Sequence, residues 1–280
     1  MRNITIGIVI LSIILLGMVI PAGFSGEANS VVITYGETTH ANSEYKANVD
    51  AFFKSQSHLD LKNVAEKIIT ANDVNKISSS ITGKTYSSNQ IFSSALVDLN
   101  DNDNLEVSVD KSKITTITGD MYLSALKSAG IKSGHVYVTS PVTATGESAL
   151  AGIMNCYEAA TNVEIPETVK EAANNEIYTQ AEIVENSNVS PENLSKLVDD
   201  VKDTVQKENV TDHKTIVNII YNYTVINNVN ITNSDIEKLA NSIEQIQNVQ
   251  GDINKYEVKV SGALNNTTDT KGFLSGLFGK

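Results

Sequence analysis

The hydrophobic periodicity of this 280-residue chain changes near Thr161, and this change constrains the fold more than any other feature. Upstream, short segments rich in β-branched residues alternate in hydrophobicity and are separated by segments with helical spacing. Downstream, apolar residues recur at helical spacing in four segments. The sequence therefore predicts an α+β or α/β fold, with an N-terminal mixed sheet and a C-terminal bundle of about four helices. Strands are expected at 31–35, 91–97, 105–109, 114–117 and 135–139.

The segment 114–139 is expected to form a strand–helix–strand crossover. Strand 114–117 leads into a helix with Thr118 and Asp120 as N-cap candidates, and Gly130 stands where a left-handed C-cap is needed. Strand 135–139 follows. Two strands joined in this way should run parallel with a right-handed connection. A further helix is expected over 147–160.

Start signals and spacing predict the remaining elements. Amphipathic spacing favours helices over 42–56 and 59–70. The four downstream helices are expected to begin at Pro166, at Ser190, at Thr211–Asp212, and at a capping box formed by Ser234 and Glu237. Alternation over 256–260 then predicts a strand, and 261–270 reads as a linker.

An apolar run near the N-terminus predicts export. Arg2 precedes the run Ile4–Ile20, and small residues follow it up to Ala28, which is typical of a signal peptide. The run is long for a cleaved signal and slightly short for a relaxed membrane span, so cleavage and retention as an anchor both stay open. In either case residues 29–280 are expected outside the cytoplasm, secreted or attached to the membrane by residues 4–20.

These observations divide the chain into four parts. Residues 1–28 are the signal peptide or N-terminal anchor, and 29–162 form an α/β domain. Residues 163–250 form a helical domain, and 251–280 are a linker with an apolar tail.

Charge and cysteine content narrow the partners and the stabilising chemistry. The formal net charge is −12 and the pI is about 4.8, so the surface repels phosphate backbones and no nucleic-acid partner is expected. Cys156 is the only cysteine, so packing rather than an internal disulfide must stabilise the chain. It is expected to be a small buried residue on a helix. The four histidines lack metal-ligand spacing, and no cofactor is expected.

The turn around Gly146 is the first candidate site. Gly146-Glu147-Ser148 resembles the first half of a nucleophile elbow, but Leu150 stands where the second glycine is required, so no catalytic serine is expected. Free N–H groups at a helix start could instead hold an anion, with Thr145, Gly146 and Ser148 as ligand contacts. The alternative is a plain N-cap by Thr145 with a glycine that eases the turn.

A second candidate is a cluster of hard oxygen ligands after the second expected strand, at 91–97. Asp98, Asn100, Asp101 and Asp103 are residue types that calcium prefers. The cluster does not fit an EF-hand, because Asp103 occupies the glycine position, so weak calcium binding competes with a solvated hairpin loop. Sequons for N-glycosylation occur at Asn188, Asn193, Asn209, Asn222, Asn230, Asn265 and Asn266.

Several stretches in a fixed order resemble one family. They are ITTITGDMYLSALKSAGIKSGHVYVTSPVTATGESALAGIMNCYE, KTYSS upstream of it, and the helix starts SPENLSKLVDDV and NSDIEKLANSIEQI. The order is similar to that of the secreted bacterial and archaeal proteins catalogued as domain of unknown function 1002. The resemblance implies an exported protein of about this length, and it supplies no activity and no catalytic residues.

The sequence favours a non-enzymatic binding or structural module of the cell envelope, with an envelope protein or a cell-wall component as partner. The export segment and the missing catalytic motifs motivate this hypothesis. Two alternatives stay open. One is an extracytoplasmic hydrolase that uses paired carboxylates, which needs no short motif. The other is a sensor that binds a small anion at residues 145–148.

Overall fold

The computed structural model of the chain describes residues 30–100, 104–187 and 189–278, with side chains up to Leu264. Its centre is a five-stranded mixed sheet in the order β2-β1-β3-β5-β4. The pairs β1–β2 and β4–β5 are parallel, and β3 pairs antiparallel with both β1 and β5. The strands are β1 (Val31–Gly36), β2 (Ala65–Ile69), β3 (Ser94–Asp98), β4 (Leu105–Val109) and β5 (Gly134–Thr139).

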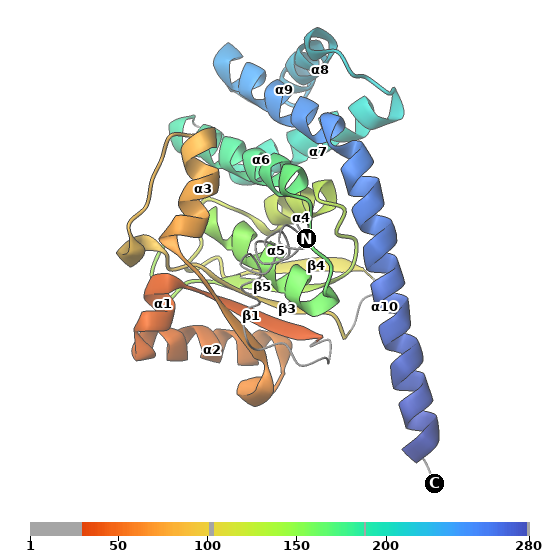
Figure 1. Cartoon of the computed structure of the whole chain (residues 1–280). Helices are drawn as coiled ribbons and strands as arrows, with labels where there is room; N and C mark the ends of the chain where they lie inside the picture. Colours follow the sequence, from red (N-terminus) through yellow and green to blue (C-terminus); the bar gives the residue numbers. More distant parts are fainter. Residues whose placement is uncertain (1–29, 101–103, 188, 279–280) are drawn as a thin grey trace, which may run out of the picture.

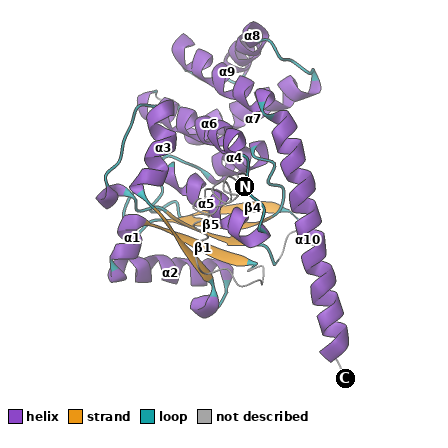
Figure 2. Ribbon diagram, viewed as in Figure 1, coloured by secondary structure: helices purple, strands orange, loops and turns teal. Residues whose placement is uncertain are grey.

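Helices cover both faces of this sheet and continue beyond it (Figures 1 and 2). On one face lie α1 (Glu37–Ala41) and α2 (Ser43–Ser57), and on the other lie α3 (Ala71–Ile81), α4 (Gly119–Ser128) and α5 (Ser148–Thr161). Farther from the sheet come α6 (Glu167–Asn186), α7 (Pro191–Lys207), α8 (His213–Ile226) and α9 (Asn233–Asn248). The predicted mixed sheet followed by helices is therefore confirmed.

The crossover is confirmed, but its first strand is β4 rather than 114–117. Ile114 makes only an isolated bridge with Ala144, and the Ile117 N–H bonds to the Thr145 carbonyl. The alternation at 114–117 was misleading because these residues pair with a loop instead of another strand. The helix signals were correct: the Thr118 side chain accepts the Met121 N–H, and Gly130 has φ +77°.

The helix expected over 59–70 is wrong. Leu61–Asn63 is a single 3-10 turn, and β2 follows it at the edge of the sheet. Polar Glu66 and Lys67 lie in β2, so its composition does not distinguish a helix from an edge strand. Helix α3 was missed, although Thr70 and Asp73 form a full capping box at its start.

The C-terminal elements combine correct helices with two errors. Ser190 and Asp212 cap α7 and α8 as expected. The capping box of α9 consists of Thr232 and Asp235, not Ser234 and Glu237. No strand or linker interrupts the described part of the tail, because α10 spans Gln250–Phe278. Its buried Ile253 and Tyr256 follow helical spacing.

One continuous hydrophobic cluster joins the sheet to the helices. It runs from Val32 on β1 to Tyr256 on α10 and includes buried residues of α4 to α9. A smaller cluster lies on the α2 face of the sheet and includes Phe53. The division at residues 162 and 163 stays a prediction. No described helix is long and apolar enough to cross a membrane, and the expected targeting segment lies outside the described residues.

Candidate functional site

The predicted turn site lies in a tightly packed loop before α5. Gly146 has φ +112°, and Tyr122 Oη donates a hydrogen bond of 2.5 Å to its carbonyl. A Cβ at position 146 would lie 2.7 Å from Tyr122 Oη, so glycine is required here. Thr145 was expected to cap α5, and this is wrong, because its hydroxyl donates to the Glu147 carboxylate instead.

Glu147 occupies the start of α5, where a bound anion was one of the two alternatives. It is 3% exposed, and burial raises the pKa of its carboxyl group. The Glu147 carboxyl group and the Tyr122 side chain occupy the space next to the turn. Ligand contacts through Thr145, Gly146 and Ser148 stay a prediction.

The acidic loop after β3 is only partly described. Asp98 Oδ1 accepts the Asn100 N–H at 2.8 Å, which is an Asx turn. Asp101 and Asp103 lie outside the described residues. Within the described residues, no group of three His, Cys, Asp or Glu side chains could hold a metal ion. Calcium binding stays a prediction.

The structure shows the positions of Cys156 and of four sequon asparagines. Cys156 is fully buried, and burial raises the pKa of its thiol to about 12. The sequon residues Asn193, Asn209, Asn222 and Asn230 are exposed. Asn188 and the side chains of Asn265 and Asn266 lie outside the described part of the chain. Glycosylation stays a prediction.

A buried charge network joins α4, α6 and α7. Lys202 Nζ lies 2.8 Å from Glu176 Oε1, 2.7 Å from Ser124 Oγ and 2.6 Å from Ser128 Oγ. Glu176 is 2% exposed, and its other oxygen accepts from Ser128 at 2.7 Å. Ser124 Oγ also lies 2.5 Å from Asp199 Oδ1. Burial, the largest influence, raises the pKa of Asp199.

This network fits a structural role better than a catalytic one. The Lys202 ammonium has three N–H donors and oxygen neighbours for all of them, so it offers no lone pair to accept a serine proton. Ser124 lies inside α4, where backbone N–H groups are used by the helix and do not form an oxyanion hole. The network borders a cavity of about 530 Å³ between α4, α7, α9 and α10.

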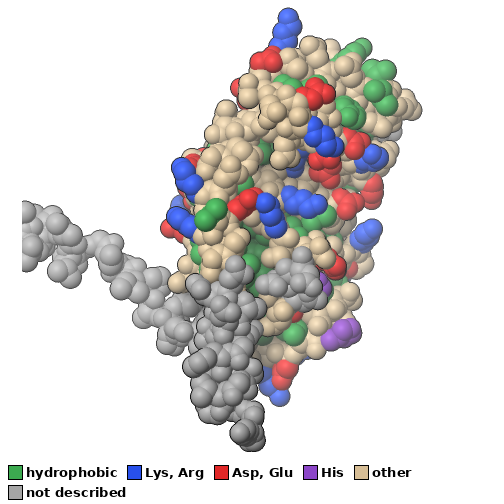
Figure 3. All heavy atoms as spheres, turned by 90° about the vertical axis from the view of Figure 1, so that its right-hand side faces the viewer, with side chains coloured by type: hydrophobic (Ala, Val, Ile, Leu, Met, Phe, Trp, Pro, Cys, Tyr) green, Lys and Arg blue, Asp and Glu red, His purple; other side chains and the backbone are tan. Residues whose placement is uncertain are grey.

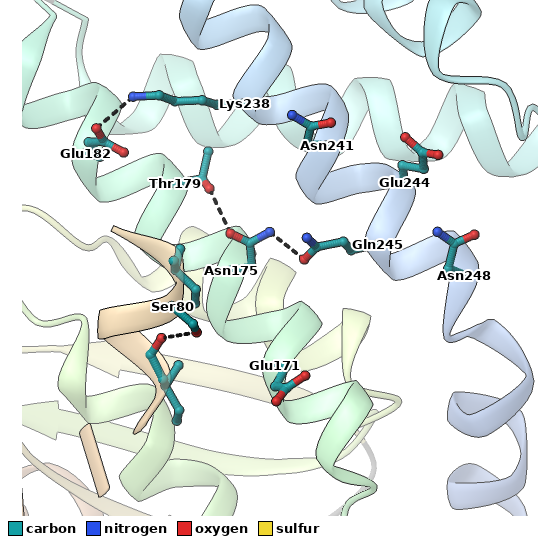
Figure 4. Close-up of a pocket in the computed structure, with 12 residues that line it drawn as sticks. Ser80, Glu171, Asn175, Thr179, Glu182, Lys238, Asn241, Glu244, Gln245 and Asn248 are labelled. Atoms are coloured by element: carbon teal, nitrogen blue, oxygen red, sulfur yellow. Dashed lines mark hydrogen bonds and ion pairs between the residues drawn. The ribbon is translucent and has the colours of Figure 1, made fainter. Parts of the chain in front are cut away.

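The strongest candidate site is a groove between α3, α6 and α9. Its volume is about 650 Å³, within the range of small-molecule sites. Each helix contributes one face, and the lining is rich in amides and carboxylates (Figure 4). We call this the amide groove; it is lined by Ile77, Ser80, Ile81, Glu171, Asn175, Thr179, Glu182, Lys238, Asn241, Glu244, Gln245 and Asn248.

Helical spacing places these side chains together. On α6, Glu171, Asn175 and Thr179 follow one another at intervals of four residues and so share one face. On α9, Asn241, Gln245 and Asn248 do the same at intervals of four and three. The extensive packing of α6 against α9 turns these polar faces toward a common space, as Figure 4 shows.

Hydrogen bonds fix the centre of the amide groove. Thr179 Oγ1 donates to Asn175 Oδ1 at 3.3 Å, and Asn175 Nδ2 donates to Gln245 Oε1 at 2.5 Å. Lys238 forms an ion pair with Glu182 at 2.7 Å. This row joins α6 to α9 and holds its amide groups in fixed orientations, as Figure 4 shows.

Other polar groups of the groove have no partner among the described residues. The side chains of Glu171, Asn241 and Asn248 make no hydrogen bond or ion pair with any residue that the structure describes, and all three are exposed. Their donors and acceptors are therefore available to a ligand. Sequence reasoning missed the groove because a polar helix face is usually a solvated one. The only signal was the recurrence of amides at helical spacing.

Comparisons with known proteins agree with the resemblance found in the sequence. The family model described as "Protein of unknown function (DUF1002)" matches residues 35–263. The "Uncharacterized protein YpuA" of Bacillus subtilis (strain 168) is 28% identical over 256 residues, which cover 90% of this chain and 84% of that protein. No solved structure matches the chain. Because the family model spans most of its length, the chain belongs to the DUF1002 family.

Proposed function

We propose that this protein is exported and acts in the cell envelope as a binding module that holds a hydroxyl-rich cell-wall fragment in the amide groove. The apolar run Ile4–Ile20 with its small-residue flank supports export. The surface charge supports a ligand other than nucleic acid. No enzymatic step is part of this proposal.

One observation carries the assignment of the groove. The polar side chains of Glu171, Asn241 and Asn248, which have no partner among the described residues, surround a fixed row of hydrogen-bonded amides in a cavity of about 650 Å³. Amide groups both donate and accept, and carboxylates accept, which matches the hydroxyl groups of a sugar. Ile77 and Ile81 add an apolar wall for the faces of a ring.

Titration of the purified protein with soluble glycan–peptide fragments of the cell wall tests this function. A fragment at about 100 times its dissociation constant should raise the free energy of unfolding by about 2.7 kcal/mol. Asn241→Ala should weaken binding about fivefold, because one hydrogen bond contributes about 1 kcal/mol. Asn222→Ala, an exposed amide on α8, is the matched control and should leave binding unchanged. Equal effects of the two variants would contradict the proposed function.

A hydrolase is the second candidate, because the carboxylates of Glu171 on α6 and Glu244 on α9 line the same groove. Paired carboxylates from facing elements are the groups that glycoside hydrolysis requires. Incubation of the same fragments with the protein, followed by mass spectrometry, separates the two functions. Cleavage that is lost in Glu171→Gln would replace the binding function with a catalytic one.

A further inference from the structure

We infer that the ligand of the amide groove carries a positively charged amine, which places it among amino sugars that lack an N-acetyl group. This inference rests on the proposed function and adds the chemical class of the ligand. It follows from the charges that line the groove and from the partners that those charges have inside the protein.

The charge lining the amide groove is unbalanced. Three carboxylates line it, from Glu171, Glu182 and Glu244, against the single ammonium of Lys238. Lys238 is already paired with Glu182 at 2.7 Å. Glu171 and Glu244 therefore have no lysine or arginine partner among the groove residues. A phosphate or carboxylate ligand would be repelled at this position, whereas an ammonium would be attracted.

Glu171 is the group most available to a cation. It is exposed on α6 one turn before Asn175, which belongs to the fixed amide row. Figure 4 shows Glu171 on the same wall as Asn175 and separate from the Lys238–Glu182 pair. A ligand that bonds to the amide row through its hydroxyl groups would thus bring a neighbouring amine within reach of Glu171.

Glu244 is held in place from outside the groove. Its Oε2 lies 2.9 Å from His213 Nδ1, and the other ring nitrogen of His213 lies 2.9 Å from Glu237 Oε2. A histidine between two carboxylates must donate through both nitrogens, so this arrangement favours imidazolium. The contact fixes the orientation of Glu244 and leaves its other oxygen, Oε1, without a hydrogen bond to a described residue.

The neutral lining determines what else the ligand carries. The amide row and the free amides of Asn241 and Asn248 offer donors and acceptors to hydroxyl groups. Ile77 and Ile81 offer an apolar surface. A linear polyamine would use the carboxylates and leave the amides unpaired, which costs affinity. An amino sugar uses both.

Two oligosaccharides that differ only in acetylation test the inference. A glucosamine tetramer and an N-acetylglucosamine tetramer carry the same ring hydroxyl groups, but only the first carries ammonium groups. Calorimetric titration of the full chain, below the pKa of the amines, should show the glucosamine tetramer binding about tenfold more tightly or better. The advantage should shrink at high salt, because screening weakens exposed charge pairs.

Substitution of a carboxylate inside the groove and of one outside it tests whether the affinity difference between the two tetramers arises in the groove. Glu171→Gln should remove most of the glucosamine advantage, because it should weaken binding of the glucosamine tetramer more than binding of the N-acetylglucosamine tetramer. Glu208→Gln makes the same change of net charge at an exposed site outside the groove and should preserve the advantage. Thermal melting of each variant verifies that it folds, which is expected because Glu171 is exposed and loses no contact with a partner in the described part of the chain.

The outcomes separate this inference from the proposed function. Equal binding of the two tetramers, reduced in Asn241→Ala, would overturn the inference and leave the groove function standing. A glucosamine advantage that persists in both Glu171→Gln and Glu244→Gln would also overturn it. Absence of binding by both tetramers, together with binding of a cell-wall peptide elsewhere on the protein, would overturn the groove function itself.

Discussion

Replacement of Lys202 by methionine tests the buried charge network most severely. Methionine keeps an unbranched apolar chain out to the position of Cε and removes the ammonium group. Glu176, which is 2% exposed, then loses its ion-pair partner at 2.8 Å and keeps only the hydroxyl groups of Ser124 and Ser128. An uncompensated charge therefore remains between α4, α6 and α7.

The expected loss is about 3 kcal/mol of unfolding free energy. Removal of one partner of a buried ion pair costs about 3–5 kcal/mol, and the lower end applies because water reaches the Lys202 side chain, which is 18% exposed. For a domain of this size the melting temperature should fall by roughly 6–12 °C. Lys207→Met on the same helix is the matched control. The Lys207 side chain is 77% exposed and faces Asp203 at 3.6 Å, so its loss should stay within about 0.5 kcal/mol.

Urea unfolding at neutral pH, followed by circular dichroism, measures both variants. The double variant Glu176→Gln/Lys202→Met should recover part of the loss, because a neutral amide replaces the unpaired carboxylate. A loss below about 1 kcal/mol in Lys202→Met would refute the description of Lys202 and Glu176 as a buried ion pair. An equal loss in Lys207→Met would refute it as well.

Three further predictions follow from single sites. Gly146→Ala should lower the free energy of unfolding by about 2 kcal/mol or more in urea, because φ is +112° and the new Cβ would meet Tyr122 Oη. Gly251→Ala is the control, because its Cβ would enter open space and should leave the free energy of unfolding unchanged. Cys156 should resist alkylation in the folded protein and react only on unfolding, because the thiol is buried and its pKa is raised to about 12. His213→Gln should flatten the dependence of stability on pH just above pH 6.5.

The sign of the His213 effect follows from linkage. Hydrogen bonds to Glu237 and then Glu244 raise the pKa of His213 above the ordinary value of 6.5. The stabilisation is therefore complete below about pH 6.5 and is lost as the pH rises through the folded pKa. Melting curves of the starting protein and of His213→Gln from pH 5 to 9 measure this pH dependence, and parallel curves would contradict the double hydrogen bond.

Fast alkylation of Cys156 in the native state, or a Gly146→Ala protein as stable as the starting protein, would contradict the packing at those sites.

The sequence predicted helix starts correctly where residues close together in the chain determine the structure. The N-caps at Thr118, Ser190 and Asp212 could be predicted because each is a hydrogen bond between a side chain and a backbone N–H a few residues later. The structure of segment 59–70 could not be predicted from its own pattern. An edge strand with polar outward residues forms because it pairs with a neighbouring strand, here β1. For the same reason the bridge of Ile114 to a distant loop could not be predicted.

The amide groove depends on tertiary packing and was beyond sequence reasoning. Asn175 and Gln245 are 70 positions apart, and nothing in either helix indicates that they share a hydrogen bond. Lys238 and Glu182, which form the ion pair, are 56 positions apart. Periodicity identified which face of α6 and α9 is apolar, but the relative rotation of the two helices determines which polar residues meet.

Nuclear magnetic resonance of the side-chain amides tests the central claim most directly. Titration of the isotopically labelled full chain with a glucosamine tetramer should shift the Asn175, Asn241, Gln245 and Asn248 side-chain signals together, with one dissociation constant. The exposed amide of Asn222 on α8 should not move. Shifts confined to residues outside the groove, or no shifts of these four amides at saturating ligand, would contradict the claim that the groove is the ligand site.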